Sequence, residues 1–149
     1  MRTLLLIFVF LFVVNASNAQ NTDKRNSIFV ESNIIASLSL SYDRIVPVGE
    51  KIAIMFGGDY FMGIGFGQGS HWLVPEIDLL SFGPRHFLET GVQYAFGIPQ
   101  DSEDSESSPG LRLAYRLQGN KGITFRATAN VFFNMDPVLI PTIGIGYSF

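Results

Sequence analysis

Thr142-Ile143-Gly144-Ile145-Gly146-Tyr147-Ser148-Phe149 is the stretch of sequence that decides the fold. Every second residue of this octet is bulky and apolar, and the residues between them are small or polar. An alternation with a period of two predicts a β-strand with one apolar face and one small, polar face. The strand stops on a bulky aromatic residue, whereas chain termini usually fray in solvent. A closed barrel would give such a strand a partner on each edge, so the octet predicts a barrel.

The same alternation recurs from Ser27 onward, and no convincing helical period interrupts it. Clusters of Gly, Pro, Asn and Ser separate the alternating runs where turns are needed. The pattern predicts a single all-β domain of eight strands, at about residues 27–33, 36–46, 51–61, 71–80, 86–96, 111–117, 123–133 and 138–149. Pro75 lies inside the fourth run, where it predicts a bulge or weak pairing because proline lacks the backbone N–H.

The first nineteen residues have the features of a secretory signal peptide. Arg2 supplies a positive charge, and Leu4 to Val14 form an apolar run that is too short to cross a bilayer. Small residues follow up to Ala19, so we expect cleavage after Ala19; an uncleaved membrane anchor is the alternative. Residues 20–26 are polar and are expected to form a flexible leader, and the barrel is expected to occupy residues 27–149.

The composition excludes several classes of protein. The chain has no cysteine, which excludes a disulfide scaffold, a thiolate metal site and a lipid-modified N-terminal cysteine. Without the signal peptide and its Arg2, nine Lys and Arg residues stand against thirteen Asp and Glu, a formal charge of −4. Four of the acids lie in the run 101–106, and the remaining charges balance. No cluster of basic residues indicates nucleic-acid binding.

Two architectures fit eight alternating strands: a soluble lipocalin-like barrel with an apolar interior, and a membrane barrel with an apolar exterior. The apolar face is aliphatic in mid-strand and aromatic toward the strand ends, as the two interfaces of a membrane require. The aromatic residues concerned are Tyr42, Tyr60, Tyr94, Phe96, Tyr115, Tyr147 and Phe149. The opposite face holds Gly, Ala, Ser and charges of both signs, which suit the narrow interior of an eight-stranded barrel. We therefore predict a closed antiparallel up-and-down transmembrane β-barrel.

Charged residues of the inner face are predicted to form a network across the lumen. They are Asp43, Asp59, Glu76, Asp78, Glu89, Arg112, Arg116 and Arg126. An unpaired charge is costly in so narrow a space, so we expect these charges to pair and plug the lumen rather than to line a polar path or a ligand site. Because the acids outnumber the arginines, some carboxyl groups are expected either to stay protonated or to reach Arg44 or Lys51.

The lengths of the connections predict an orientation. The turns after the second, fourth and sixth strands are short, and the connections after the third and fifth are long. Short turns mark the periplasmic side of outer-membrane barrels, and an even number of strands would leave both termini there. The glycine-rich loop 63–70 and the acidic loop 97–110 would then project outward.

The chain resembles the small eight-stranded outer-membrane β-barrel proteins of Gram-negative envelopes. In the terminal octet, Thr142, Gly144, Tyr147 and Phe149 have the spacing of the assembly signal of that family. Segments 41–44 (SYDR) and 87–91 (FLETG) also resemble strand motifs of uncharacterised barrels of this kind. The resemblance implies an integral outer-membrane protein whose last strand is recognised by the barrel-assembly machinery. Outer-membrane lipid would surround it, and we expect a monomer that binds no nucleic acid.

Two departures from the family pattern concern register. The first outer connection, Ile34-Ile35, is very short, and Pro75 interrupts the fourth strand. They leave the register of the first, second and fourth strands open. The overall pattern favours a non-enzymatic protein with a structural or surface-interaction role, without catalytic residues, metal or cofactor.

Two other functions remain as alternatives. A lipid-modifying enzyme would need His, Ser and a carboxylate together at the outer rim. His71 is expected near that rim beside Ser70, but neighbours on a strand point in opposite directions, and His86 is expected at the other end. A secreted, soluble, lipocalin-like ligand carrier is the second alternative.

The acidic run 101–106 and Trp72 are interpreted without a specific binding function. The acidic run 101–106 offers hard oxygen ligands but lacks the spacing and the turn glycine of a calcium loop, so we interpret it as a solvated charge run. Trp72 is predicted to anchor the barrel at a membrane interface.

Overall fold

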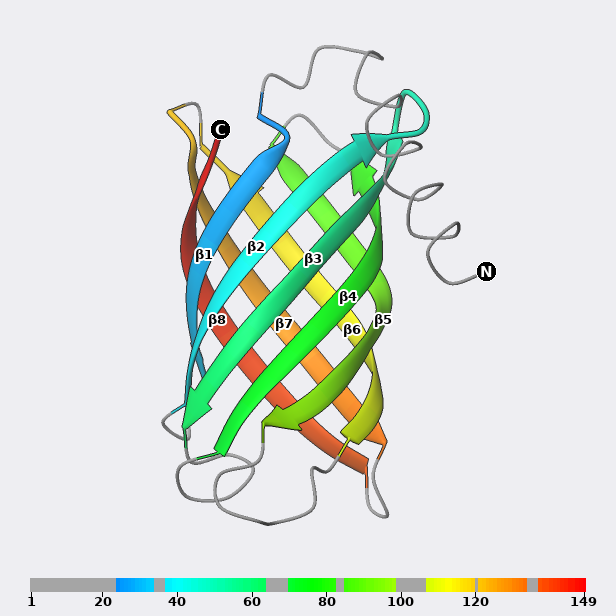
Figure 1. Cartoon of the computed structure of the whole chain (residues 1–149). Coiled ribbons are helices and arrows are strands. Elements are labelled where there is room, and N and C mark those ends of the chain that lie inside the picture. The colour runs from blue at the N-terminus through cyan, green and yellow to red at the C-terminus, as the bar shows by residue number, and fades with distance from the viewer. Residues whose placement is uncertain are drawn as a thin grey trace, which may run out of the picture.

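The computed structural model describes residues 24–33, 37–63, 70–82, 85–98, 107–119, 121–133 and 137–149. They form a closed barrel of eight antiparallel strands in sequence order (Figure 1). The strands are β1 (Asn26–Asn33), β2 (Ser37–Pro47), β3 (Ile52–Gly63), β4 (Ser70–Phe82), β5 (His86–Ile98), β6 (Ser107–Gln118), β7 (Ile123–Phe133) and β8 (Pro137–Ser148). The predicted fold class is confirmed. The expected signal peptide lies outside the described residues, among which no helix could cross a membrane.

The strand register fixes how steeply the strands wind around the barrel. Ser27 on β1 pairs with Asp43 on β2, and following the paired residues from strand to strand leads to Val138 on β8. Ser27 itself pairs with Ser148 across the β1–β8 seam, so the row returns ten residues out of register. This stagger tilts the strands against the barrel axis, as closure requires and as Figure 1 shows.

The two ends of the barrel differ in their connections. β1, β3, β5 and β7 begin at one end of the barrel, which is uppermost in Figure 1 and which we call the turn end. The opposite end is called the loop end. At the turn end, the N–H groups of Val48 and Gly49 both donate to the carbonyl of Ile52, which closes the β2–β3 turn. Gly122 closes the β6–β7 turn with a φ of 96°, in the left-handed region that favours glycine.

The outward face of the barrel is apolar. Its aliphatic side chains, such as Leu40, Ile77 and Leu113, are about half exposed. Four tyrosine hydroxyls on this face hydrogen-bond to a polar side chain of a neighbouring strand: Tyr42 with Asn26, Tyr60 with His71, Tyr94 with Ser107 and Tyr115 with His86. Asn26 and His86 lie at the turn end, whereas His71 and Ser107 lie at the loop end. Tyrosines with polar partners thus occur toward both ends of an aliphatic band.

The lumen is filled in three layers, and β4 shows their order along one strand. Trp72 and Val74 come first, Glu76 and Asp78 follow, and Leu80 comes last; all five side chains are buried. Trp72 and Val74 belong to an apolar cluster at the loop end, with Phe61, Ala95, Phe132 and Ile140. Leu80 belongs to a second cluster at the turn end, with Ile45, Ala53 and Met55. A charged layer therefore lies between two apolar plugs.

Several local predictions differ from the structure. Trp72 is only 4% exposed and points into the lumen, so its assignment as an interface anchor is wrong. At Pro75 the β4–β5 pairing is interrupted but resumes in the same register, with Leu73 opposite Phe96 and Glu76 opposite Gln93. Of the two outcomes predicted for Pro75, weak pairing is therefore found and a bulge is not.

Strand ends were also predicted too short. β5 continues to Ile98 and β6 begins at Ser107, inside the stretch 97–110 that was expected to be a loop. Asn26, assigned to the leader, exchanges two backbone hydrogen bonds with Phe149, with N–O distances of 2.9 and 2.8 Å. The acidic residues Asp101, Glu103, Asp104 and Glu106 lie outside the described residues.

The glycines of β8 allow bulky lumen side chains to lie against the barrel wall. A Cβ atom at Gly146 would lie 2.4 Å from the Phe29 ring and 2.4 Å from the carbonyl oxygen of Ile28. Phe29 is fully buried, so it has little room to move aside. Glycine at this position therefore determines how closely β8 and β1 can pack at the seam.

We predict that Gly146→Ala destabilises the folded barrel by about 1–3 kcal/mol, because overpacking forces side chains and backbone out of position. Urea unfolding of the protein in detergent micelles measures the free energy of unfolding. Gly49→Ala is the matched control, because no atom lies within 4 Å of a Cβ built there. Equal stability of the two variants would contradict the proposed packing at the seam.

Candidate functional site: the charged lumen

Three arginines hold the charged layer together, and each contacts more than one carboxylate. Arg126 on β7 pairs with Glu31 and with Asp43, whose Oδ2 is 2.6 Å from Nη1. Arg116 on β6 pairs with the same Asp43 oxygen at 2.5 Å and with Glu89. A guanidinium has five N–H donors in a planar fork, so one arginine can serve several acceptors.

Arg112 is the centre of the second part of the charged layer. It forms an ion pair with Glu76, and its Nε is 3.5 Å from Asp78 Oδ2. Longer contacts, of 3.7 to 4.0 Å, reach Glu89 and Asp59. Glu89 is shared by all three arginines, so the layer is one connected cluster.

The cluster is completely enclosed. The three arginine side chains have no exposed surface, and no carboxylate side chain in it exceeds 2%. The Phe29 ring lies against it on the turn side, with the guanidinium carbons of Arg126 and Arg116 at 4.0 and 4.8 Å from the ring centroid. These distances allow cation–π attraction in addition to the ion pairs.

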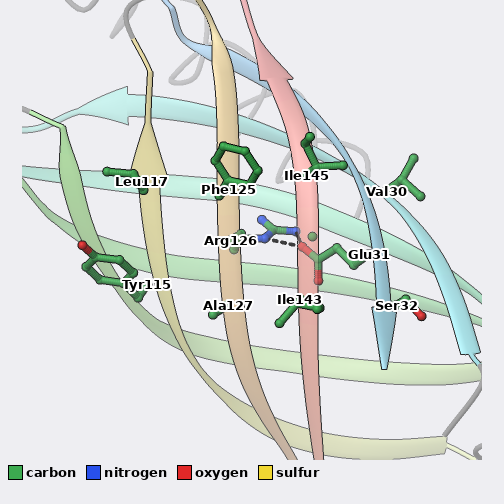
Figure 2. Close-up of a pocket in the computed structure, with 11 residues that line it drawn as sticks. Val30, Glu31, Ser32, Tyr115, Leu117, Phe125, Arg126, Ala127, Ile143 and Ile145 are labelled. Atoms are coloured by element: carbon green, nitrogen blue, oxygen red, sulfur yellow. Dashed lines mark hydrogen bonds and ion pairs between the residues drawn. The ribbon is translucent and has the colours of Figure 1, made fainter. Parts of the chain in front are cut away.

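The structure brings together all eight residues of the predicted lumen network. Glu31 also belongs to the cluster; the alternation in β1, which places it on the same face as Phe29, is the sequence signal that could have found it. Figure 2 shows its ion pair with Arg126. No contact of the cluster with Arg44 or Lys51 occurs among the described residues: Arg44 is half-buried and Lys51 is exposed.

The octet residues Thr142, Gly144, Tyr147 and Phe149 have different surroundings. Thr142 donates a hydrogen bond of 2.9 Å to Glu31, and a Cβ at Gly144 would lie 2.5 Å from Glu31 Cγ. Tyr147 and Phe149 point outward and are about half exposed. The two inward positions therefore support the charge cluster, and the two outward positions belong to the apolar exterior.

Each histidine is hydrogen-bonded to a tyrosine on a neighbouring strand. The ring of His71 stacks on Tyr60 and its Nδ1 is 2.8 Å from the tyrosine hydroxyl. His86 hydrogen-bonds to Tyr115 at the turn end. The described residues also contain no group of His and acidic side chains with metal-binding geometry.

Solved structures share this barrel. The outer membrane protein Ail of Yersinia pestis, in a phospholipid bilayer nanodisc, superposes with a TM-score of 0.57 at 11% identity, covering 85% of this chain and 100% of Ail. The N-terminal β-barrel domain of Pseudomonas aeruginosa OprF also gives 0.57 at 11% identity, covering 84% and 96%. The chain has the fold of the small outer-membrane barrels. A designed transmembrane β-barrel reaches 0.54 at 11% identity, covering 88% of this chain and 100% of the design.

The likeness to these outer-membrane barrels is one of fold. No protein-family model and no curated protein matches the sequence. The resemblance predicted from the octet is thus confirmed for the architecture.

We predict that Arg126→Met destabilises the barrel by about 3–5 kcal/mol, because it leaves buried carboxylates without their partner. Urea unfolding in micelles measures the loss, and Arg44→Met, at the half-buried arginine of β2, is the control. Adding Glu31→Gln to Arg126→Met should restore part of the stability, with a coupling of about 0.5–3 kcal/mol. Strictly additive effects would show that the two side chains do not interact.

Proposed function

We propose that the protein is a non-enzymatic integral outer-membrane β-barrel with a structural or surface-interaction role. The observation that supports this proposal is that apolar side chains lie outside and charged side chains lie inside, the reverse of a soluble protein. Large apolar residues on all eight strands point outward and remain exposed, whereas six acids and three arginines are buried inside. Soluble monomers rarely expose a continuous apolar surface, because it would drive association. A hydrocarbon environment removes that difficulty, and closure leaves no strand edge unpaired in it.

The filled lumen supports a structural role rather than transport or ligand carriage. The charged layer is blocked on one side by the apolar cluster around Trp72 and on the other by the cluster around Leu80. An eight-stranded barrel has an interior that side chains just fill. Any surface interaction would then be made by the connections at the loop end.

Orientation, partners and oligomeric state belong to the same proposal. The turn end would face the periplasm, because short connections mark that side. Lipid would cover the exterior of a monomer. The barrel-assembly machinery would recognise Thr142, Gly144 and Tyr147 in β8 together with the adjoining Phe149, and the last two lie exposed on the outer face.

We predict that the mature protein sediments with the outer-membrane fraction and migrates faster on gels before boiling than after it. The reason is that a closed barrel stays compact in detergent until heat separates its strands. Membrane fractionation with gels of boiled and unboiled samples tests both points. A protein that stays in solution without detergent and ignores boiling would instead support the lipocalin-like alternative.

The same assay tests the proposed assembly signal. Deletion of Phe149 is expected to lower the amount of heat-modifiable barrel in the outer membrane severalfold. The purified variant refolded in detergent serves as the control, because there no machinery has to recognise the strand. Normal assembly in cells would contradict the signal.

We further predict no stable conductance from the pure protein in a planar lipid bilayer, because both ends of the charged layer are closed by apolar side chains. Single-channel recording is the measurement. Reproducible open steps from the wild-type protein would overturn the plugged lumen and favour a transport role.

A further inference from the structure

An apolar groove of about 580 Å³ lies on the outer surface over β6, β7, β8 and β1. Its side chains form two rows across these strands, which Figure 2 shows one above the other. The first row is Leu117, Phe125, Ile145 and Val30, and the second is Tyr115, Ala127, Ile143 and Ser32. Ala127 creates the hollow, because it is the small residue paired between Tyr115 and Ile143.

The floor of the groove is the barrel wall over the charge cluster. Arg126, Gly144 and Glu31 line it, with the two charged side chains ion-paired to each other on the lumen side. A Cβ atom at position 144 would lie 2.5 Å from Glu31 Cγ, so glycine at this position allows the Glu31 side chain to lie against the barrel wall. The groove is therefore held in place by the ion pair beneath it and does not depend on a mobile loop.

Two cations lie at the turn end of the groove. Lys121 belongs to the turn between β6 and β7, four residues after Leu117 and four residues before Phe125 in the chain. Arg85 is next to the end of β6, since its carbonyl accepts a 2.8 Å hydrogen bond from the N–H of Gln118. Both residues are exposed, and no ion pair involving either is found in the described part of the chain.

These cations belong to a wider asymmetry of charge. Lys24, Arg25, Arg44, Lys51, Arg85 and Lys121 all lie at the turn end, where Glu50 is the one acid among the described residues. We call these six residues the basic rim. The sequences that connect the strands at the other end, 34–36, 64–69, 99–106 and 134–136, contain five acids and no Lys or Arg. The turn end therefore attracts anions, and the loop end does not.

We propose that the groove and its two cations bind one anionic phospholipid. The phosphate lies at Lys121 and Arg85, and one acyl chain follows the groove past Leu117 and Phe125 to Ala127. The proposal rests on the membrane location proposed above. An anionic phospholipid requires an apolar groove for its acyl chain and positive charge at the membrane interface for its phosphate, and this site offers both.

A second copy of the chain fits the groove less well than a lipid does. Two barrels in one membrane related by a two-fold axis along the membrane normal meet at equal depth. With the axis passing through the groove, the hollow at Ala127 would face the same hollow in the partner and remain unfilled. A flexible acyl chain can follow the groove without such a constraint.

The test uses the full mature protein, refolded in detergent and shown to be heat-modifiable, with native mass spectrometry as the readout. Dioleoylphosphatidylglycerol and dioleoylphosphatidylcholine are added separately as probes. We expect one phosphatidylglycerol to be retained with an affinity roughly tenfold above that for phosphatidylcholine, a factor that corresponds to about 1.4 kcal/mol. Inorganic phosphate, which lacks acyl chains, should not compete.

Two variants and their matched controls test the two halves of the site. Ala127→Phe fills the hollow and should reduce retention of both lipids, whereas Thr90→Phe adds the same ring to the outward face of β5, which does not line the groove. The double variant Arg85→Glu with Lys121→Glu should abolish the preference for phosphatidylglycerol. Lys51→Glu, which reverses a basic-rim charge away from the groove, should leave most of that preference.

Retention that is equal for the two lipids, or equal in the Ala127→Phe and Thr90→Phe variants, would overturn the proposal. So would a dimer that Ala127→Phe disrupts, since the groove would then serve a second copy. A heat-modifiable barrel without selective retention would contradict this inference alone. A protein that is soluble without detergent would contradict the membrane location as well.

Discussion

The ion pairs of Arg112, Arg116 and Arg126 are the constraint on which the rest of the barrel depends. A membrane barrel needs an apolar exterior, and an interior of this width must be filled with side chains. Charges can fill it only if they pair, because an isolated charge in a dry lumen is costly. The structure meets this condition with three guanidinium groups that each contact at least two carboxylates. The glycines of β8 and the apolar plugs are arranged around that cluster.

The alternation of residues was sufficient to predict the fold and most of the lumen. The exceptions are places where the preference of a residue type, or the local composition, points to a different structure than the alternation does. Trp72 lies an even number of residues from Val74 and Glu76, so the alternation points it inward, whereas the preference of tryptophan for membrane interfaces predicts an outward position. Similarly, the acidic composition of the run before Pro109 masked the start of β6 at Ser107.

The pairing of charges could not be predicted from the sequence. Glu31 and Arg126 are 95 residues apart, and their contact depends on the stagger of ten residues that accumulates around the barrel. A different stagger would bring other residues to the same depth in the lumen. The groove at Ala127 could not be predicted from the sequence for the same reason, since its two rows combine four strands that only the register aligns.

The β1–β8 seam has a consequence for how the barrel forms. Its contacts join residues such as Ser27 and Ser148, 121 positions apart along the chain, so they carry the largest loop-closure entropy and should form late. Before closure, Glu31 on β1 lacks the neighbouring Thr142 of β8, and the lumen is open along its length. An open sheet could not enter hydrocarbon without exposing charged side chains and two unpaired edges. In the proposed membrane setting, closing the seam and entering the hydrocarbon would therefore proceed together, which would make the seam a late step of assembly.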